Sequence, residues 1–268
     1  MQERDFIPAI GMTSNKFWKE VGQESKNNEA DNILVYMGLM LEKASAAHVP
    51  VRKADFEKLG RQLTFFDGVE KYKNSDGDEE LGWFQRINQY GIESGVRVEH
   101  YVISSGIREM ARASKIGKFM KMIYASSFWY DHNNVAKWPA LALNYTTKTQ
   151  YLFRINKGSH HVYDHELIND YVPQNERPVP FQNMIFIGDG ETDIPCFRLV
   201  KDQGGHSIAV HHAGKRGAKS RSDKLLAEGR VNFAAAADYR NGTMLDRIVK
   251  GIIEKVAMDN HLRVLGKH

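Results

Sequence analysis

The stretch NMIFIGDGETD, residues 183–193, combines residue types that suit metal and phosphate chemistry. The apolar residues 184–187 predict a short buried strand, and the Gly-Asp-Gly triplet that follows predicts a sharp turn before a helix. Asp189 and Asp193 are therefore expected at the carboxyl end of a strand, the edge at which open α/β sheets bind ligands. Carboxylate oxygens are preferred ligands of Mg²⁺. The segment predicts a site for Mg²⁺ and phosphate.

Two further segments carry groups for the same task. The segment YVISSG ends a predicted strand in Ser104, Ser105 and Gly106, which suit hydrogen bonding to phosphate oxygens. Lys148 lies at a predicted helix start, where a cation and backbone N–H groups together attract an anion. The two carboxylates of the Gly-Asp-Gly segment would then hold Mg²⁺ and orient this lysine.

Hydrophobic spacing indicates how these groups are positioned. The N-terminal third predicts helices, and the rest of the chain alternates strands with helices, which implies a parallel sheet. The predicted helices span residues 16–24, 33–41, 53–63, 107–116, 147–156, 194–201, 223–228 and 245–256. The predicted strands span residues 97–104, 120–125, 184–187, 207–210 and 231–235, with a hairpin within 128–143. The fold class is therefore α/β.

Composition limits the classes of function. A chain of 268 residues with 42% hydrophobic residues forms one large domain or a core with a smaller inserted domain. No apolar run approaches the roughly 18 residues that span a bilayer, and the first residues lack the order of a signal peptide. A single cysteine, Cys196, fits a reducing compartment. The net charge of +4 is too small to indicate nucleic-acid binding. We expect a cytoplasmic protein with neither membrane nor nucleic acid as partner.

Ser104, Lys148, Asp189 and Asp193, in this order, give the sequence a resemblance to the haloacid dehalogenase (HAD) superfamily, most closely to its phosphoserine-phosphatase-like branch. The resemblance implies a Rossmann-like core with a parallel sheet over residues 76–268 and a helical cap over residues 1–75. It also implies a hydrolase, a phosphatase, that acts on a small phosphorylated metabolite with Mg²⁺ as cofactor.

The resemblance also implies roles for single residues. Ser104 matches the hydroxyl of the second HAD motif, with Ser105 and Gly106 in place of a glycine pair, and Lys148 matches the lysine of the third. Asp189 matches the metal ligand of the fourth motif and Asp193 its supporting carboxylate. Phosphate binding is thus expected from the Ser-Ser-Gly segment and Lys148, metal binding from Asp189, and catalytic roles from Lys148 and Asp193.

The first HAD motif, a buried central strand ending in DxD that supplies the nucleophile, is missing before the cap-like helices. Two segments are alternatives: FFDGV with Asp67, which follows the cap, and NSDGDEE at 74–80, which no apolar strand precedes. The absence suggests a gene start placed too late, a strand supplied by another chain, or a truncation. Without the nucleophile the chain is expected to be inactive, and the alternative function is a non-catalytic or regulatory protein that binds phosphate and Mg²⁺.

Each feature also has a simpler interpretation. Asp189 and Asp193 alone are typical of a turn and a helix N-cap. Lys157 rivals Lys148, although a lysine at a helix end more often stabilises that end. The basic run within 215–224 is expected to be a solvated loop that could steer an anionic substrate. The tryptophans are expected to pack inside the core or cap; they are Trp18, Trp83, Trp129 and Trp138.

Overall fold

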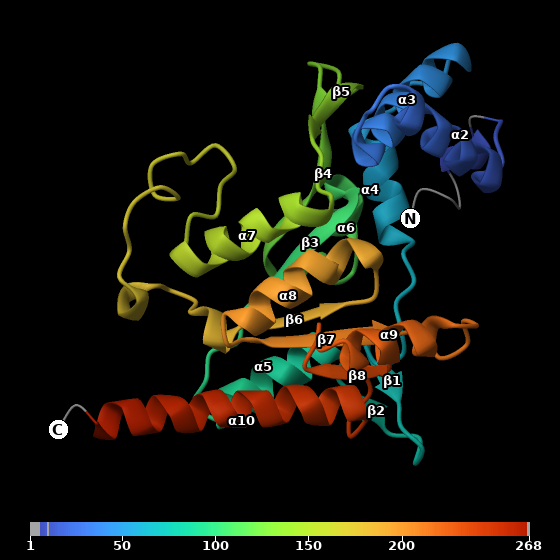
Figure 1. Cartoon of the computed structure of the whole chain (residues 1–268). Helices are drawn as coiled ribbons and strands as arrows, with labels where there is room; N and C mark the ends of the chain where they lie inside the picture. Colours follow the sequence, from blue (N-terminus) through green and yellow to red (C-terminus); the bar gives the residue numbers. More distant parts are fainter. Residues whose placement is uncertain (1–5, 10, 267–268) are drawn as a thin grey trace. The chain divides into compact units, whose positions relative to one another are not determined.

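The structure, a computed structural model, describes residues 6–9 and 11–266 (Figure 1). It divides into two compact units, one formed by residues 1–64 with 101–144 and the other by 65–100 with 145–268. The units therefore interleave along the chain. The predicted boundary between residues 75 and 76 lies inside the second unit, and the assignment of these parts as cap and core stays a prediction.

The first unit contains the N-terminal helices, in agreement with the predicted helical third. They are α1 (Phe6–Ala9), α2 (Ser14–Asn27), α3 (Asn32–Ala46) and α4 (Lys53–Arg61). Thr13 caps α2 by accepting a hydrogen bond from the backbone N–H of Lys16 at 3.3 Å. Asp31 caps α3 by accepting from the N–H groups of Ile33 and Leu34 at 2.8 and 3.0 Å. Side chains of this type satisfy the free N–H groups of a first helical turn.

A three-stranded sheet completes the first unit, in the order β3-β4-β5. Its elements are β3 (His100–Ile107), α6 (Arg108–Ala113), the 3₁₀ turn η1 (Gly117–Phe119), β4 (Met120–Tyr130) and β5 (Ala136–Leu141). Strands β4 and β5 form an antiparallel hairpin. Asp131 shapes its turn, because its carboxylate accepts from the N–H groups of Asn133 and Val135, both at 2.9 Å. The predicted hairpin is confirmed.

The core of the first unit joins the helices to this sheet. The rings of Phe56 on α4 and Phe128 on β4 stack at 5.7 Å between centroids. Helix α4 also crosses α6 so closely that a Cβ on Gly60 would lie 2.3 Å from the carbonyl oxygen of Met110. Only glycine allows this approach, so the contact fixes where the two helices cross.

The second unit has three layers, with helices on both faces of a sheet (Figure 1). Its strands are β1 (Tyr72–Lys73), β2 (Glu79–Glu80), β6 (Ile185–Gly188), β7 (His206–His211) and β8 (Phe233–Ala236). Its helices are α5 (Trp83–Glu93), α7 (Tyr145–Lys157), α8 (Ile194–Asp202), α9 (Ala218–Ala227) and α10 (Met244–Leu265), with 3₁₀ turns η2 (Gln174–Glu176), η3 (Phe181–Asn183) and η4 (Glu191–Asp193). Strands β6, β7 and β8 are parallel, which confirms an α/β fold with parallel strands.

Alternate residues of β7 face opposite helical layers. Ile208 and Val210 belong to the core that α5 and α10 close, whereas Ala209 packs with Phe197 of α8 and Leu225 of α9. Figure 1 shows the same arrangement, with α10 and α5 on one face of this sheet and α8 on the other. The carboxyl ends of β6 and β7 therefore open next to α8 and α9.

Among the described residues, β3 and β4 lie in a different sheet from β6, β7 and β8, and a HAD-type core stays a prediction. Strand β6 is an edge strand there, paired with β7 alone, and its residues are half-buried. An apolar parallel strand is typical of the inside of a sheet. The exposed edge is what a sheet that lacks one neighbouring strand would show.

Several boundaries also differ from the predictions. Helix α9 begins at Ala218, five residues before the predicted start, and α10 continues to Leu265. Trp83 is buried, but Trp129 and Trp138 are 60% and 58% exposed on the β4–β5 hairpin, so the expectation that they pack inside is wrong. Among the described residues no helix combines the length and the apolar character needed to cross a membrane.

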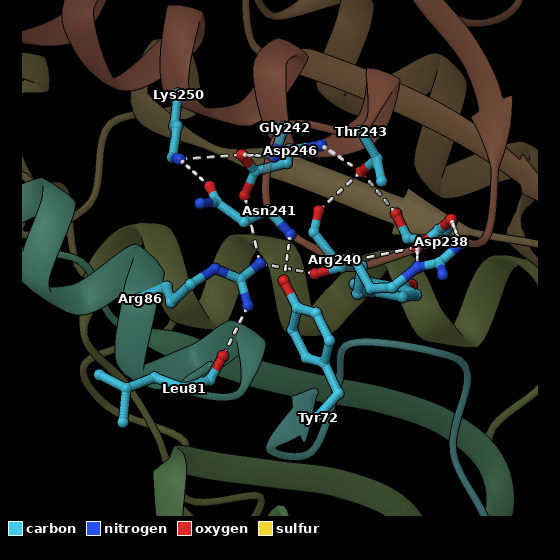
Figure 2. Close-up of polar contacts among 11 residues, drawn as sticks. Tyr72, Leu81, Arg86, Asp238, Arg240, Asn241, Gly242, Thr243, Asp246 and Lys250 are labelled. Atoms are coloured by element: carbon cyan, nitrogen blue, oxygen red, sulfur yellow. Dashed lines mark hydrogen bonds and ion pairs between the residues drawn. The ribbon is translucent and has the colours of Figure 1, made fainter. Parts of the chain in front are cut away.

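A buried polar network holds α5, the β1–β2 hairpin and α10 together (Figure 2). Asp246, which is fully buried, pairs with Arg86 at 3.3 Å and with Lys250 at 2.9 Å, and accepts from the N–H of Gly242 at 3.0 Å. Arg86 also donates to the carbonyl oxygens of Leu81 and Tyr239 at 2.7 and 2.6 Å. The network therefore joins α5 and the hairpin before it to the start of α10, which lies 160 residues further along the chain.

The long segment after α7 is held by two cations of that helix. Buried Arg154 donates to the carbonyl oxygens of His161 and Asp164 at 2.7 and 3.2 Å. Lys157 donates to the carbonyl oxygens of Ile168 and Asp170 at 2.7 and 2.6 Å. Both side chains thus bind the main chain of the loop.

Candidate functional site

The carboxyl end of β6 leads directly into the Gly-Asp-Gly turn, as the sequence indicates. Asp193 folds back over this turn, and its Oδ2 accepts from the N–H of Gly190 at 3.2 Å. A Cβ on Gly188 would lie 2.6 Å from the same carboxylate oxygen. The turn requires glycine at this position because the carboxylate occupies the space of a side chain.

Lys148 and Asp193 form a buried ion pair next to this turn. Lys148 Nζ donates to Asp193 Oδ1 at 2.8 Å and to Thr192 Oγ1 at 2.9 Å. The side chains are only 5% and 11% exposed. Helix α7 presents the lysine, and it packs against both α8 and η4. The structure therefore brings these two predicted site residues together; their catalytic roles stay predictions.

Asp189, the predicted metal ligand, is exposed at the tip of the turn. Burial, helped by the charge of Asp189, raises the pKa of the nearby Tyr239 to about 12. Within the described residues, no three side chains of the His, Cys, Asp and Glu types gather closely enough to hold a metal ion. Asp189 fits Mg²⁺ as a single carboxylate ligand, and water or substrate oxygens would have to complete its coordination.

The Ser-Ser-Gly segment lies at the end of β3, in the first unit. Ser104 Oγ accepts from the N–H of Gly106 at 3.0 Å, and the carbonyl oxygen of Ser105 accepts from the hydroxyl of Tyr36 at 2.9 Å. The hydroxyl of Ser105 is buried and has no hydrogen-bond partner in the described part of the chain. That Ser104 meets the residues around Lys148 in one site stays a prediction.

Neither alternative for the missing nucleophile follows a buried strand. Asp67 is exposed in a turn, and its carbonyl oxygen accepts from the N–H of Tyr239 at 2.8 Å. Asp76 and Asp78 lie in the β1–β2 turn, where Asn74 Oδ1 accepts from their N–H groups at 3.0 and 2.9 Å. These carboxylates belong to local turns.

The simpler interpretations hold for several other residues. Cys196 is fully buried, and burial raises the pKa of its thiol to about 12, so it behaves as a small apolar residue. His211 Nδ1 hydrogen-bonds with Ser222 Oγ at 2.9 Å, and His212 Nδ1 accepts from the N–H of Gly214 at 3.0 Å. Lys157, the alternative candidate for the phosphate-binding lysine, binds the main chain of the loop after α7.

A groove of about 570 Å³ opens beside the Gly-Asp-Gly turn, between α8 and α9. The turn, the end of β7 and the inner face of α9 line it. Sequence reasoning missed this groove, because the approach of two helices is a tertiary contact. It also missed Thr192 as a partner of Lys148. The position of this hydroxyl residue next to Asp193 in the sequence could have indicated the contact.

Comparison with known proteins gives little functional information. No model of a known protein family matches the chain. The chain is 28% identical to a protein of Borreliella burgdorferi described as uncharacterized, over 91% of this chain and 87% of that protein. The similarity therefore extends over both units.

Proposed function

We propose that this protein binds a small phosphorylated metabolite, together with Mg²⁺, in a site of the HAD phosphohydrolase type. The observation that supports this most is the buried Lys148–Asp193 pair beside the Gly-Asp-Gly turn, at the carboxyl end of a parallel strand. Burying two charges costs desolvation energy, so the pair is weak support for a purely stabilising role. Its location at the ligand-binding edge of the sheet favours a functional one.

Lys148 is suited to hold a phosphoryl oxygen. An ammonium group carries three protons, and two of them engage Thr192 and Asp193. The third has no acceptor among the described residues, so it is free to bind an anion. Asp193 keeps the ammonium in position.

Asp189 is the residue that would hold Mg²⁺, because it is exposed in the Gly-Asp-Gly turn over which Asp193 folds. When bound, the ion would neutralise charge on the phosphoryl group.

Hydrolysis by the HAD route needs a carboxylate nucleophile, and a strand added beside β6 would deliver one. A partner chain is one source of such a strand. A non-catalytic phosphate-binding or regulatory protein is the second candidate, and it is favoured by the placement of Asp67, Asp76 and Asp78 in local turns.

Phosphate binding can be tested by thermal unfolding and ³¹P NMR with inorganic phosphate, with and without Mg²⁺. We expect phosphate to raise Tm, Lys148→Met to abolish the effect, and Asp189→Asn to abolish only its Mg²⁺-dependent part. The exposed Lys219→Met is the matched control and should respond like the native chain. Asp189→Asn removes a charge at the surface, so it separates loss of binding from loss of folding. An unchanged Tm and spectrum in all conditions would refute the proposal.

Turnover is tested on the same samples with p-nitrophenyl phosphate. We expect the purified chain to show no hydrolysis, because the candidate nucleophiles Asp67, Asp76 and Asp78 lie in local turns. Mg²⁺-dependent hydrolysis that disappears in Asp189→Asn would contradict that expectation and establish an enzyme.

A further inference from the structure

The groove between α8 and α9 continues the proposed phosphate site, because Gly188, Asp189 and Gly190 line it as well. Its volume of about 570 Å³ lies within the range of sites for small organic ligands, about 300–1,000 Å³. A phosphate ion would fill only a small part of it. The groove can therefore accommodate the organic part of a substrate.

The base of the groove is apolar. The half-buried Ile194 and Leu225 supply its accessible apolar surface, and Phe197 and Ala209, at 0% and 2% exposed, line it from within the core. A surface of this kind stabilises a flat apolar group by removing it from water. It offers no hydrogen bonds to a chain of hydroxyl groups, so a ring system fits it better than an open sugar.

The charges around the groove are unevenly paired. Glu228 neutralises two of the lining cations, Arg230 at 2.9 Å and Lys224 at 3.7 Å. Lys215 and Arg221, which also line the groove, have no acidic partner among the described residues. Two cations on the loop before α9 and on α9 itself are thus free to bind an anion.

The Gly-Asp-Gly turn contributes charge of the opposite sign, since Asp189 and Glu191 also line the groove. Asp189 would hold Mg²⁺, through which a phosphate can bind despite the charge of these carboxylates. The free cations come from different elements and suit a second anionic group.

We infer that the substrate is a phosphorylated compound with a flat apolar body and a second anionic group, of the class of nucleoside bisphosphates. The phosphoryl group lies at the turn, the body lies over Ile194 and Leu225, and the second anion binds Lys215 and Arg221. This inference rests on the proposed function, because it describes the rest of the same ligand.

The test is calorimetric titration, in the presence of Mg²⁺, with adenosine 3′,5′-bisphosphate, AMP, adenosine and inorganic phosphate. We expect the bisphosphate to bind at least about ten-fold more tightly than AMP, since one charge-assisted contact accounts for such a ratio. Arg221→Gln should remove most of this preference while leaving phosphate binding unchanged. Arg216→Gln is the matched control, because Arg216 is an exposed neighbour that does not line the groove.

Fructose 1,6-bisphosphate tests the apolar body, and we expect it to bind more weakly than the nucleoside bisphosphate. Equal binding of AMP and the nucleoside bisphosphate, or an unchanged preference in Arg221→Gln, would overturn the inference while phosphate binding stood. Equal binding of the two bisphosphates would overturn the assignment of a flat body. If inorganic phosphate also failed to bind, the proposed function itself would be refuted.

Discussion

Single residues in this protein show how burial decides what a side chain can do. Lys148 and Asp193 are both buried and hold each other, whereas Asp189, four residues before Asp193, is exposed. Removing one partner of a buried pair costs about 3–5 kcal/mol because the other charge is left uncompensated. Lys148→Met could lose ligand binding because it folds less stably, so its free energy of unfolding must be measured as well. Asp189→Asn changes an exposed residue, so a loss of binding in this variant reports on the ligand contact alone.

His100 provides a prediction on pH at this scale. Desolvation lowers its pKa from 6.5 to about 4, and its ring hydrogen-bonds with Asn88 and packs edge-on against Phe84. Above pH 6.5 the imidazole is neutral in both states, and its full contribution to stability is present. As the pH falls from 6.5 toward 4, the imidazole of His100 binds a proton in the unfolded chain but not in the folded chain, so the free energy of unfolding decreases.

The measurement is urea unfolding of the native chain and His100→Gln at pH 7.5 and pH 4.5. Glutamine can donate to Asn88 but does not titrate in this range. We expect the native chain to lose on the order of 2 kcal/mol more than the variant between the two pH values. The exposed His165→Gln should behave like the native chain. Identical pH dependence of native chain and His100→Gln would show that His100 is not the group responsible.

Elements are joined by buried polar contacts as well as by apolar packing, and the network of Asp246 gives the prediction here (Figure 2). Asp246→Ala leaves Arg86, whose side chain is 9% exposed, without its carboxylate, and should lower the free energy of unfolding by about 3–5 kcal/mol. Urea unfolding measures the change.

The matched control is Asp259→Ala on the same helix. Asp259 pairs with Lys255 at 2.6 Å, but both side chains are about half exposed, so its removal should cost less than about 1 kcal/mol. Equal effects of the two substitutions would mean that the buried network does not join α5 to α10.

At the scale of helices and strands, the sequence predicts the elements that depend on local residue patterns. The run of apolar residues before the Gly-Asp-Gly triplet predicts β6 correctly within one residue, and the polar turn at Asp131 predicts the hairpin. The early start of α9 escapes prediction, because its first turns face inward with only Ala218 and Ser222, which give no apolar spacing. The exposure of Trp129 escapes as well, since alternation along a strand does not tell which face is covered.

Strand pairing and the site depend on contacts between distant segments, and the sequence predicts them less well. Nothing local in the sequence shows that β3 and β6 belong to different sheets. The order of Ser104, Lys148 and Asp193 predicts that the last two meet, and they do so in the second unit. The groove has no such signal, because α8 and α9 approach only in the folded chain.

The whole molecule consists of two units with separate cores, and this division can be tested. Phe56 stacks on Phe128 in the first unit, and Phe56→Ala should cost about 3–5 kcal/mol there. Hydrogen exchange should then speed up across β4 but not across α5, although α5 is closer to Phe56 in sequence.

Phe197→Ala, in the core of the second unit, is the reciprocal variant. It should speed exchange in β7 and α8 and leave β4 protected. Exchange that rises uniformly over the chain in either variant would show a single cooperative molecule in place of two units.

The loop after α7 has a consequence for how this protein can change over time. Arg154 and Lys157 hold it by its carbonyl oxygens, which every amino acid possesses. Its outward side chains, such as Tyr163 and Tyr171 at 72% and 88% exposed, can therefore be replaced without loosening it. Two cations thus leave a long stretch of surface open to new sequences. A change at Arg154 would release the main chain at His161 and Asp164 together, while Lys157 still held Ile168 and Asp170.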